Sequence, residues 1–154
     1  MTYNGDLQAL ISNGRVDRRL YTDPEIFDIE IRRIFGQAWI YVGHHSQLRR
    51  AGDFATTRIG RDRIIVVRHN DGALHAFYNR CAHRGAEVCA RPSGNTRSFV
   101  CPYHAWTYRT DGSLESIPLS KGYGADLEKR RSELGLESVA RLKSYRGFLF
   151  ASQS

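Results

Sequence analysis

The apolar residues of this chain follow a helical pattern at first and a strand pattern further along. Residues 7–11 can form a short helix, and a longer helix is expected to start near residue 24. Its start fits either a capping box of Thr22 with Glu25 or a cap by Asp23 directly before a proline. Apolar side chains then share one helical face, which we expect to pack on the core: Phe27, Ile31, Ile34, Phe35 and Ala38.

Beyond Gly36 the apolar runs become short and are separated by turn residues. Asp-Gly pairs at residues 71–72 and 111–112 are strong hairpin signals, and residues 120–132 have no regular pattern. Strands are predicted over residues 39–42, 53–59, 63–69, 73–79, 97–100, 106–109, 138–144 and 148–151. Strands at this density predict a mainly β fold, a small antiparallel sandwich or barrel preceded by a helical segment.

The chain is long enough for one domain with a short extension. It has 154 residues, 41% of them apolar and 11% aromatic, which suffices for a hydrophobic core. We therefore divide it into an N-terminal helical segment, residues 1–38, and a β domain, residues 39–154. The longest wholly aliphatic run, residues 64–67, is too short to cross a membrane. The polar start, with no early basic residue, predicts no signal peptide and a cytoplasmic protein.

Charge and cysteine content narrow the choice of partners. The net charge is +7, from 23 basic and 16 acidic residues, but the basic residues are spread along the chain. Because no basic helix or aromatic-basic strand stands out, we expect no nucleic-acid partner. The three cysteines cannot all pair with one another, so reduced thiols or metal ligands are expected.

Two segments each combine a thiol with an imidazole where a predicted strand ends in a loop. They are Cys81-Ala82-His83-Arg84-Gly85 and Cys101-Pro102-Tyr103-His104-Ala105-Trp106. Structural zinc sites commonly use Cys-x2-4-Cys and His-x3-5-His pairs, which these segments do not match. A four-coordinate zinc site with two Cys and two His nevertheless stays chemically open.

A [2Fe–2S] cluster fits the two segments better than zinc. Each iron already holds two bridging sulfides, so it needs only two protein ligands. Two such loops can supply one iron with both thiolates and the other with both imidazoles, which is the ligation of a Rieske centre. The candidate ligands are Cys81, His83, Cys101 and His104.

The residues around these ligands resemble the Rieske domain of the large (α) subunit of aromatic-ring-hydroxylating oxygenases. The matching pieces are Trp39-Ile40-Tyr41-Val42-Gly43-His44, Tyr78-Asn79-Arg80-Cys81, His83-Arg84-Gly85, Cys101-Pro102-Tyr103-His104, Trp106-x-Tyr108, Asp111-Gly112-x-Leu114 and Tyr145-Arg146-Gly147-Phe148-Leu149-Phe150. Ala105 departs from the family, which more often has Gly there. The respiratory and photosynthetic Rieske branch has a further Cys in each loop, joined as a disulfide. Those positions hold Ala86 and Tyr103 here, so that disulfide is not expected.

The resemblance implies electron transfer, with no catalytic residue in this chain. Electrons would come from a ferredoxin or a flavin reductase and pass to an oxygenase catalytic domain or a neighbouring α subunit, in a homo-oligomer. A mononuclear non-haem iron, held by two His and one carboxylate, would belong to that catalytic domain. We expect that domain to be absent from this chain, because no histidine follows His104. The whole enzyme would be a dioxygenase of aromatic hydrocarbon catabolism.

Two alternatives from other functional classes stay open. One is a stand-alone Rieske-type ferredoxin that carries electrons, although such carriers tend to be acidic and to start close to their first strand. The other is an interaction module built around a structural zinc or a cluster. The 38 residues before the first predicted strand and the basic net charge favour the oxygenase subunit.

The other conspicuous residues are interpreted as structural. Cys89 is expected to be a small buried side chain. Arg84 and Gly85 would serve the first loop, with Arg84 donating to a carboxylate or shielding the cluster. Tyr103 and Trp106 would pack the second loop, where a Tyr hydroxyl bonded to a cysteine sulfur would raise the redox potential. The remaining histidines are expected at the surface or in loops: His44, His45, His69 and His75.

Overall fold

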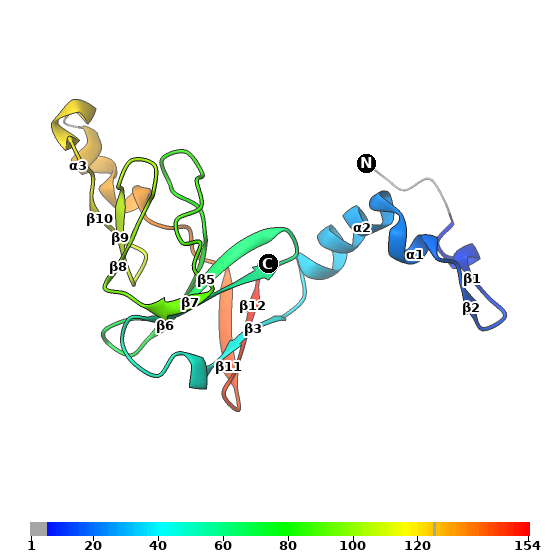
Figure 1. The fold of residues 1–154 in the computed structure, drawn as a ribbon. Helices are drawn as coiled ribbons and strands as arrows, with labels where there is room; N and C mark the ends of the chain where they lie inside the picture. The colour runs from blue at the N-terminus through cyan, green and yellow to red at the C-terminus, as the bar shows by residue number, and fades with distance from the viewer. Residues whose placement is uncertain (1–5, 125) are drawn as a thin grey trace.

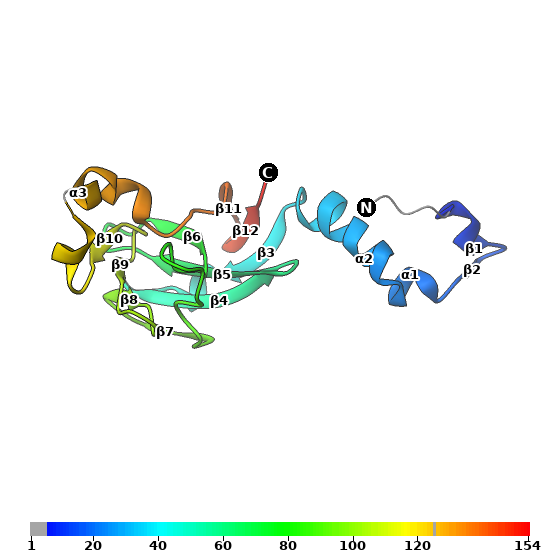
Figure 2. The ribbon, with the colours of Figure 1, turned by 90° about the horizontal axis from the view of Figure 1, so that it is seen from above.

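The computed structural model describes residues 6–124 and 126–154 and shows a β body with a helical arm (Figure 1). We call residues 6–38 the helical arm and residues 40–154 the β body. Seen from above, the arm extends away from the β body (Figure 2). None of the helices in the described parts of the chain is long and apolar enough to span a membrane.

The helical arm is built from short elements. Its main helix, α2, is followed directly by a single π-helical stretch over Ile31–Phe35. Before α2 the elements are a 3-10 turn (Gln8–Leu10), β1 (Ile11–Ser12), β2 (Arg15–Val16) and α1 (Arg19–Thr22), with α2 itself at Pro24–Glu30. The short helix expected at residues 7–11 is therefore a single 3-10 turn that leads into a two-residue hairpin.

Asp23 caps the main helix. Its carboxylate accepts from the backbone N–H groups of Glu25, at 2.8 Å, and Ile26, at 3.5 Å, and Pro24 is the first helical residue. Thr22 ends the preceding helix instead, where its hydroxyl donates to the carbonyl of Arg18. The cap by Asp23 is confirmed, and the capping box with Thr22 is wrong because that residue is itself helical.

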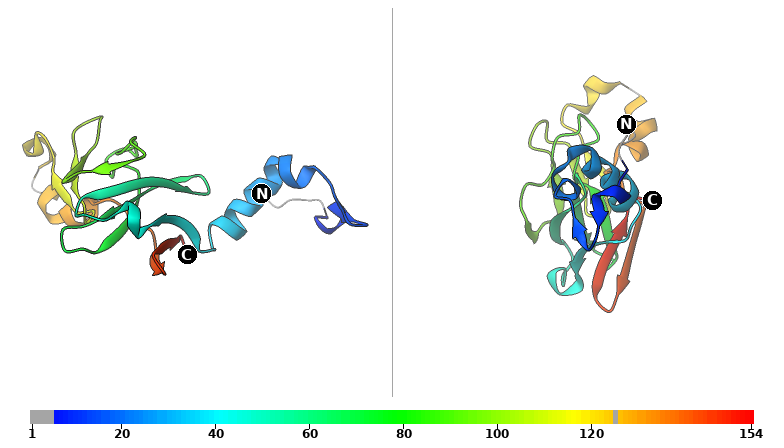
Figure 3. Two further views of the ribbon diagram at one scale, coloured as in Figure 1. Left: turned by 60° about the horizontal axis from the view of Figure 1, so that its bottom comes forward. Right: turned by 90° about the vertical axis from the view of Figure 1, so that its right-hand side faces the viewer.

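The predicted apolar face of the main helix is only partly covered. Ile31 and Phe35 reach the turn between β4 and β5, where a Cβ on Gly60 would lie 3.0 Å from Ile31 Cδ1. Phe27 and Ile34 stay largely exposed, because the arm projects beyond the β body (Figure 3). Further contacts with the same turn come from Arg61, which pairs with Asp28 at 2.5 Å and lies over the Phe27 ring. The prediction that the whole face packs on the core is wrong.

Three antiparallel sheets make up the β body, as the strand pattern predicts. The four-stranded sheet has the order β6-β5-β4-β7, with β4 at Asp53–Ile59, β5 at Asp62–Arg68, β6 at Leu74–Tyr78 and β7 at Ser93–Asn95. The second sheet has the order β11-β12-β3, with β3 at Ile40–His44, β11 at Arg141–Tyr145 and β12 at Phe148–Ser152. The third has the order β10-β9-β8, with β8 at Ser98–Val100, β9 at Thr107–Arg109 and β10 at Leu114–Ser116.

Within the β body, sequence reasoning missed β7 and β10, and the segment that it left irregular is partly helical. That segment contains a 3-10 turn (Ser120–Tyr123), α3 (Asp126–Arg130) and a second 3-10 turn (Arg131–Leu134). A further 3-10 turn, His45–Gln47, follows β3. The sequences of the two missed strands, Ser93–Asn95 and Leu114–Ser116, contain at most one apolar residue each, so neither shows an apolar run.

Strand β5 is buried on both faces, which explains its unbroken aliphatic run. Ile64 and Val66 point into the cluster shared with the β11-β12-β3 sheet. Ile65 and Val67 point the opposite way, into the cluster that continues to β8, β9 and both cysteine segments. Since successive side chains of a strand alternate between faces, β5 connects two separate cores.

The second Asp-Gly turn packs tightly against the core. Gly112 has a φ of +86°, and a Cβ placed there would lie 2.4 Å from Cε1 of Phe77. Gly72, in the corresponding turn of the β5–β6 hairpin, has a φ of +87° but nothing within 4 Å of such a Cβ. The two turns therefore share a backbone conformation and differ in their packing.

Replacement of these two glycines separates backbone strain from overpacking. Gly72→Ala should cost about 1–2 kcal/mol, because only the left-handed conformation opposes the methyl group. Gly112→Ala should cost about 1–3 kcal/mol more, because the same methyl must also displace the Phe77 ring. Denaturant unfolding of both variants measures the difference, and equal losses would contradict the tight contact.

The histidines outside the two cysteine segments differ in their surroundings. His69 Nδ1 lies 2.7 Å from the hydroxyl of Thr110, and His45 Nε2 lies 3.0 Å from that of Ser144. His75 is stacked on Phe77, with ring centroids 5.6 Å apart, and its Nε2 atom is buried without a partner in the described chain. The surface interpretation is therefore wrong for His75, whose side chain faces the core.

Burial of His75 predicts a loss of stability in acid. Desolvation first, and the neighbouring His69 second, lower the pKa of His75 below its usual 6.5, against opposing contributions from Asp71 and Asp111. The folded state then disfavours the proton, so the free energy of unfolding falls as the pH drops below about 6.5. In His75→Phe this part of the pH dependence should vanish. Melting temperatures of the metal-free chain between pH 7.5 and 5 test it, and an unchanged slope in the variant would refute it.

Candidate metal centre

The two cysteine segments fold into turns with the same backbone hydrogen bonds. In the first, Cys81 N–H donates to the carbonyl of Ala86 and Gly85 N–H to that of Cys81, both at 2.8 Å. In the second, Cys101 N–H donates to Trp106 at 2.9 Å and Ala105 N–H to Cys101 at 3.0 Å. The fifth residue of each turn has a positive φ, +71° at Gly85 and +53° at Ala105. Ala105 thus adopts the conformation for which Gly is suited.

The thiols of the two turns lie inside, and the imidazoles lie further out. Cys81 and Cys101 are 3% and 2% exposed, in the same core cluster. Burial raises the pKa of the Cys81 thiol, and the adjacent Cys101 thiol raises it further. The rings of His83 and His104 lie 4.8 Å apart between centroids, with His104 exposed and His83 half-buried. The structure therefore places the two candidate thiols beside each other and the two candidate imidazoles beside each other.

The donor set fits a [2Fe–2S] cluster. His83 Nδ1 is buried without a hydrogen-bond partner in the described residues, as a nitrogen reserved for a metal would be. Burial, then His104 and Arg84, lower the pKa of His83, so its ring is neutral, the form that binds metal. Among the described residues, no group of three or more Cys, His, Asp or Glu side chains is arranged so that it could hold a metal ion. Two thiols and two imidazoles match, in number and kind, two irons with two protein ligands each.

Aromatic side chains cover the His83 ring. Trp106 stacks on it, with centroids 4.9 Å apart and planes 4° from parallel, and Tyr123 meets both rings edge-on. These rings line an open, largely apolar pocket of about 260 Å³ together with Leu127 and Leu134 from the helical segment after β10. The packing role expected for Trp106 is confirmed.

Tyr108 is the functional residue that sequence reasoning missed. Its hydroxyl lies 3.0 Å from Cys81 Sγ and accepts from the N–H of Ala82 at 3.1 Å. Burial raises the pKa of Tyr108, so the phenol keeps its proton and can donate it to the sulfur. The expected tyrosine of the second loop, Tyr103, is instead 72% exposed, and its ring meets the neighbouring His104 edge-on with centroids 6.1 Å apart, so it packs at the loop surface and not in the core. The available signal was the spacing of Trp106 and Tyr108, since alternate strand residues share a face.

The predictions for Cys89, which follows the first segment, and for Arg84, which lies within it, have different outcomes. Cys89 is buried in the core cluster, with its sulfur 3.8 Å from the carbonyl of Arg91, which confirms the packing interpretation. Arg84 is exposed and contacts no carboxylate in the parts of the chain that the structure describes, so the donor role predicted for it is not found.

Comparison with protein families and curated sequences agrees with this geometry. The family model described as the Rieske [2Fe-2S] domain matches residues 38–145. The chain is 39% identical over 150 residues to the α subunit of chlorobenzene dioxygenase from Cupriavidus sp. (strain PS12), covering 96% of this chain and 32% of that protein. It is 39% identical over 151 residues to the α subunit of biphenyl 2,3-dioxygenase from Rhodococcus jostii (strain RHA1), covering 97% and 32%.

Solved structures give the same result. A naphthalene 1,2-dioxygenase aligns with a TM-score of 0.88 and 37% identity, over 100% of this chain and 34% of that one. A quaternary ammonium Rieske monooxygenase aligns with a TM-score of 0.79 and 32% identity, over 89% and 38%. The chain spans about a third of the length of the curated relatives that it matches, and corresponds to the N-terminal part of their α subunits. The family match over most of the chain and the paired thiols and imidazoles lead to one conclusion: the chain belongs to the Rieske [2Fe-2S] domain family.

Proposed function

We propose that this chain transfers electrons through a Rieske [2Fe–2S] cluster as the N-terminal part of an aromatic-ring-hydroxylating oxygenase α subunit. The observation that supports this most directly is the pair of equivalent turns, which present two buried thiols beside two imidazoles, one with an unpartnered ring nitrogen. Cys81 and Cys101 would hold one iron, and His83 and His104 the other. When bound, such a cluster accepts and releases one electron at roughly −150 to +300 mV.

The surrounding residues suit this role. The core cluster keeps water from the two thiols, while exposed His104 leaves a short path from the site to the surface. Trp106 shields and orients the His83 ring by stacking on it. Tyr108 donates to Cys81 Sγ, which stabilises negative charge on that sulfur.

The partners and the remaining chemistry are part of the same proposal. A ferredoxin or a flavin reductase would supply electrons, and an oxygenase catalytic domain or a neighbouring α subunit of a homo-oligomer would accept them. One of the solved relatives, a quaternary ammonium Rieske monooxygenase, is described as showing inter-subunit electron transfer. The mononuclear iron and the aromatic substrate would belong to the catalytic domain. A cytoplasmic location stays a prediction.

The helical arm favours this function over a stand-alone ferredoxin. We assign the arm to an N-terminal helical segment, residues 1–38, and the cluster to a Rieske domain, residues 39–154. The arm begins more than twenty residues before β3, and it leaves Phe27 and Ile34 exposed. A free carrier has no use for such a surface, whereas a larger subunit can cover it.

Cysteine variants test the ligand assignment. The purified chain, reconstituted with iron and sulfide, should contain about two irons and two sulfides and show the visible and electron paramagnetic resonance spectra of a mixed-ligand cluster. Cys81→Ser and Cys101→Ser should lose the cluster, because each removes a ligand. Cys89→Ser is the matched control and should keep it, because that thiol only packs. Cluster loss in the control alone, or a chain that binds zinc and no cluster, would contradict the proposal.

Two tyrosine variants test the hydrogen bond to sulfur. Tyr108→Phe should lower the midpoint potential, because the sulfur loses a donor that favours the reduced form. Tyr103→Phe should leave it unchanged, because that hydroxyl is exposed on the loop surface. Redox titration of both holoproteins gives the answer, and equal shifts would show that Tyr108 does not tune the site.

A further inference from the structure

The two turns that carry the candidate ligands are closed in different ways at their bases. The second turn lies within the β8–β9 hairpin, where Val100 pairs directly with Thr107. The first turn has no such pairing, because the strand before it, β6, pairs with β5 and the strand after it, β7, pairs with β4. These strands form opposite edges of the four-stranded sheet. Strand pairing therefore leaves the two ends of the first turn unconnected.

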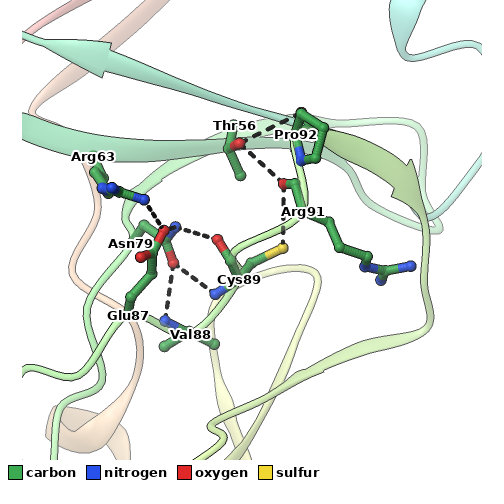
Figure 4. Close-up of polar contacts among 8 residues, drawn as sticks. All are labelled: Thr56, Arg63, Asn79, Glu87, Val88, Cys89, Arg91 and Pro92. Atoms are coloured by element: carbon green, nitrogen blue, oxygen red, sulfur yellow. Dashed lines mark hydrogen bonds and ion pairs between the residues drawn. The ribbon is translucent and has the colours of Figure 1, made fainter.

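The side chain of Asn79 connects these two ends. Asn79 follows β6, two residues before Cys81, and is 4% exposed. Its Oδ1 accepts from the backbone N–H groups of Val88 at 3.1 Å and Cys89 at 2.9 Å. Its Nδ2 donates to the carbonyl of Cys89 at 2.6 Å and to Glu87 Oε1 at 3.3 Å (Figure 4). One amide group thus replaces the missing strand pairing.

Every hydrogen-bonding position of this amide is used. A primary amide offers two acceptor positions and two donor hydrogens, and here all four have a partner. Because the group is buried, loss of the amide leaves the backbone groups of Val88 and Cys89 unpaired, away from water. The asparagine amide satisfies both backbone polarities at once, because its oxygen accepts and its nitrogen donates.

The connection leads directly to the ligands. Asn79 holds residues 87–89, and the carbonyl of Ala86, the next residue back, accepts from Cys81 N–H. The hydrogen bonds of Asn79 therefore close residues 79–89 into a loop, and Cys81 and His83 are part of that loop. A shift of residues 87–89 would move the hydrogen bond that orients the Cys81 backbone.

Arg63 and Glu87 form an outer layer of the same network. Arg63 Nη1 lies 2.5 Å from Glu87 Oε1, the same oxygen that accepts from Asn79. Both side chains are partly exposed, at 49% and 33%, so the ion pair by itself adds little stability. Its effect is to hold the carboxylate against the buried amide. The chain beyond residue 89 is attached to β4, because the hydroxyl of Thr56 in that strand donates to the carbonyl of Arg91 at 3.0 Å (Figure 4).

We propose that Asn79 is a positioning residue for the cluster: its buried amide closes the first ligand turn and thereby sets how firmly Cys81 and His83 hold iron. This rests on the proposed function, since it assigns iron to those two residues. The hydrogen bonds of the Asn79 amide go to residues 87–89 and not to the Cys81 thiol or the His83 ring. It acts through residues 86–89, so its loss should change cluster retention more than it changes fold stability.

The test compares iron loss from holoproteins of the 154-residue chain. Asn79→Ala should lose iron to an excess of chelator roughly 10–100-fold faster than the parent chain, the range typical of groups that orient metal ligands. Thr110→Val is the matched control, because it removes a buried hydroxyl bonded to His69 at 2.7 Å, outside the ligand turns. It should lower the melting temperature but lose iron at the parent rate. If Asn79→Ala also loses iron at that rate, the positioning role is refuted.

A second pair of variants keeps the test valid if Asn79→Ala does not fold. Asn79→Asp retains both acceptor contacts but sets a carboxylate against the Cys89 carbonyl and Glu87, so it should speed iron loss. Adding Glu87→Gln supplies an amide that can donate to the new carboxylate, and the double variant should recover part of the retention. No recovery would overturn the proposal.

The parent chain distinguishes the two levels of inference. If it assembles no [2Fe–2S] cluster on reconstitution, both the proposed function and the role of Asn79 fail. If it assembles the cluster and both Asn79 variants retain iron as the parent does, only the role of Asn79 fails.

Discussion

Two buried thiols must meet two imidazoles near the surface, and they come from chain segments twenty residues apart. This constraint governs the β body. The first turn follows β6, an edge strand of the four-stranded sheet, and the second turn connects β8 to β9 in another sheet. A single core cluster includes residues of both turns, together with Phe77 from β6 and Tyr108 from β9. The packing of the two sheets thus fixes the distance between the candidate ligands of the two turns, because neither turn could do so alone.

The two turns reach one backbone geometry from different surroundings. Both bond the cysteine N–H five residues on and place the fifth residue at positive φ. The conformation is the common requirement, since Gly85 meets it without strain and Ala105 meets it with a side chain. The closure of each turn differs as well, by strand pairing in one and by the Asn79 amide in the other. Similar ligand turns therefore depend on unrelated interactions.

Much of this arrangement could be predicted from the sequence, because it depends on local patterns. Alternating apolar residues and Asp-Gly turns predicted the longer strands, and the spacing of Cys and His indicated where the candidate site lies. The failures involve contacts between distant segments. Which tyrosine reaches Cys81 depends on how β9 packs against the first turn, 27 residues away, so Tyr108 could not be told from Tyr103. The covered face of the main helix depends likewise on where the arm leaves the β body, and β7, with three exposed residues, has no apolar pattern.

The points where the chain enters and leaves the β body lie next to each other. β3 begins and β12 ends as antiparallel neighbours, with Ile40 opposite Ala151, and the Ser152 hydroxyl reaches the carbonyl of Gln37 at 3.4 Å. Adjacent strands are about 4.8 Å apart, so the start of β3 and the end of β12 are separated by little more than one strand width. Units whose ends lie this close together commonly tolerate insertion into a loop of another protein, so we expect residues 38–152 to tolerate it as well.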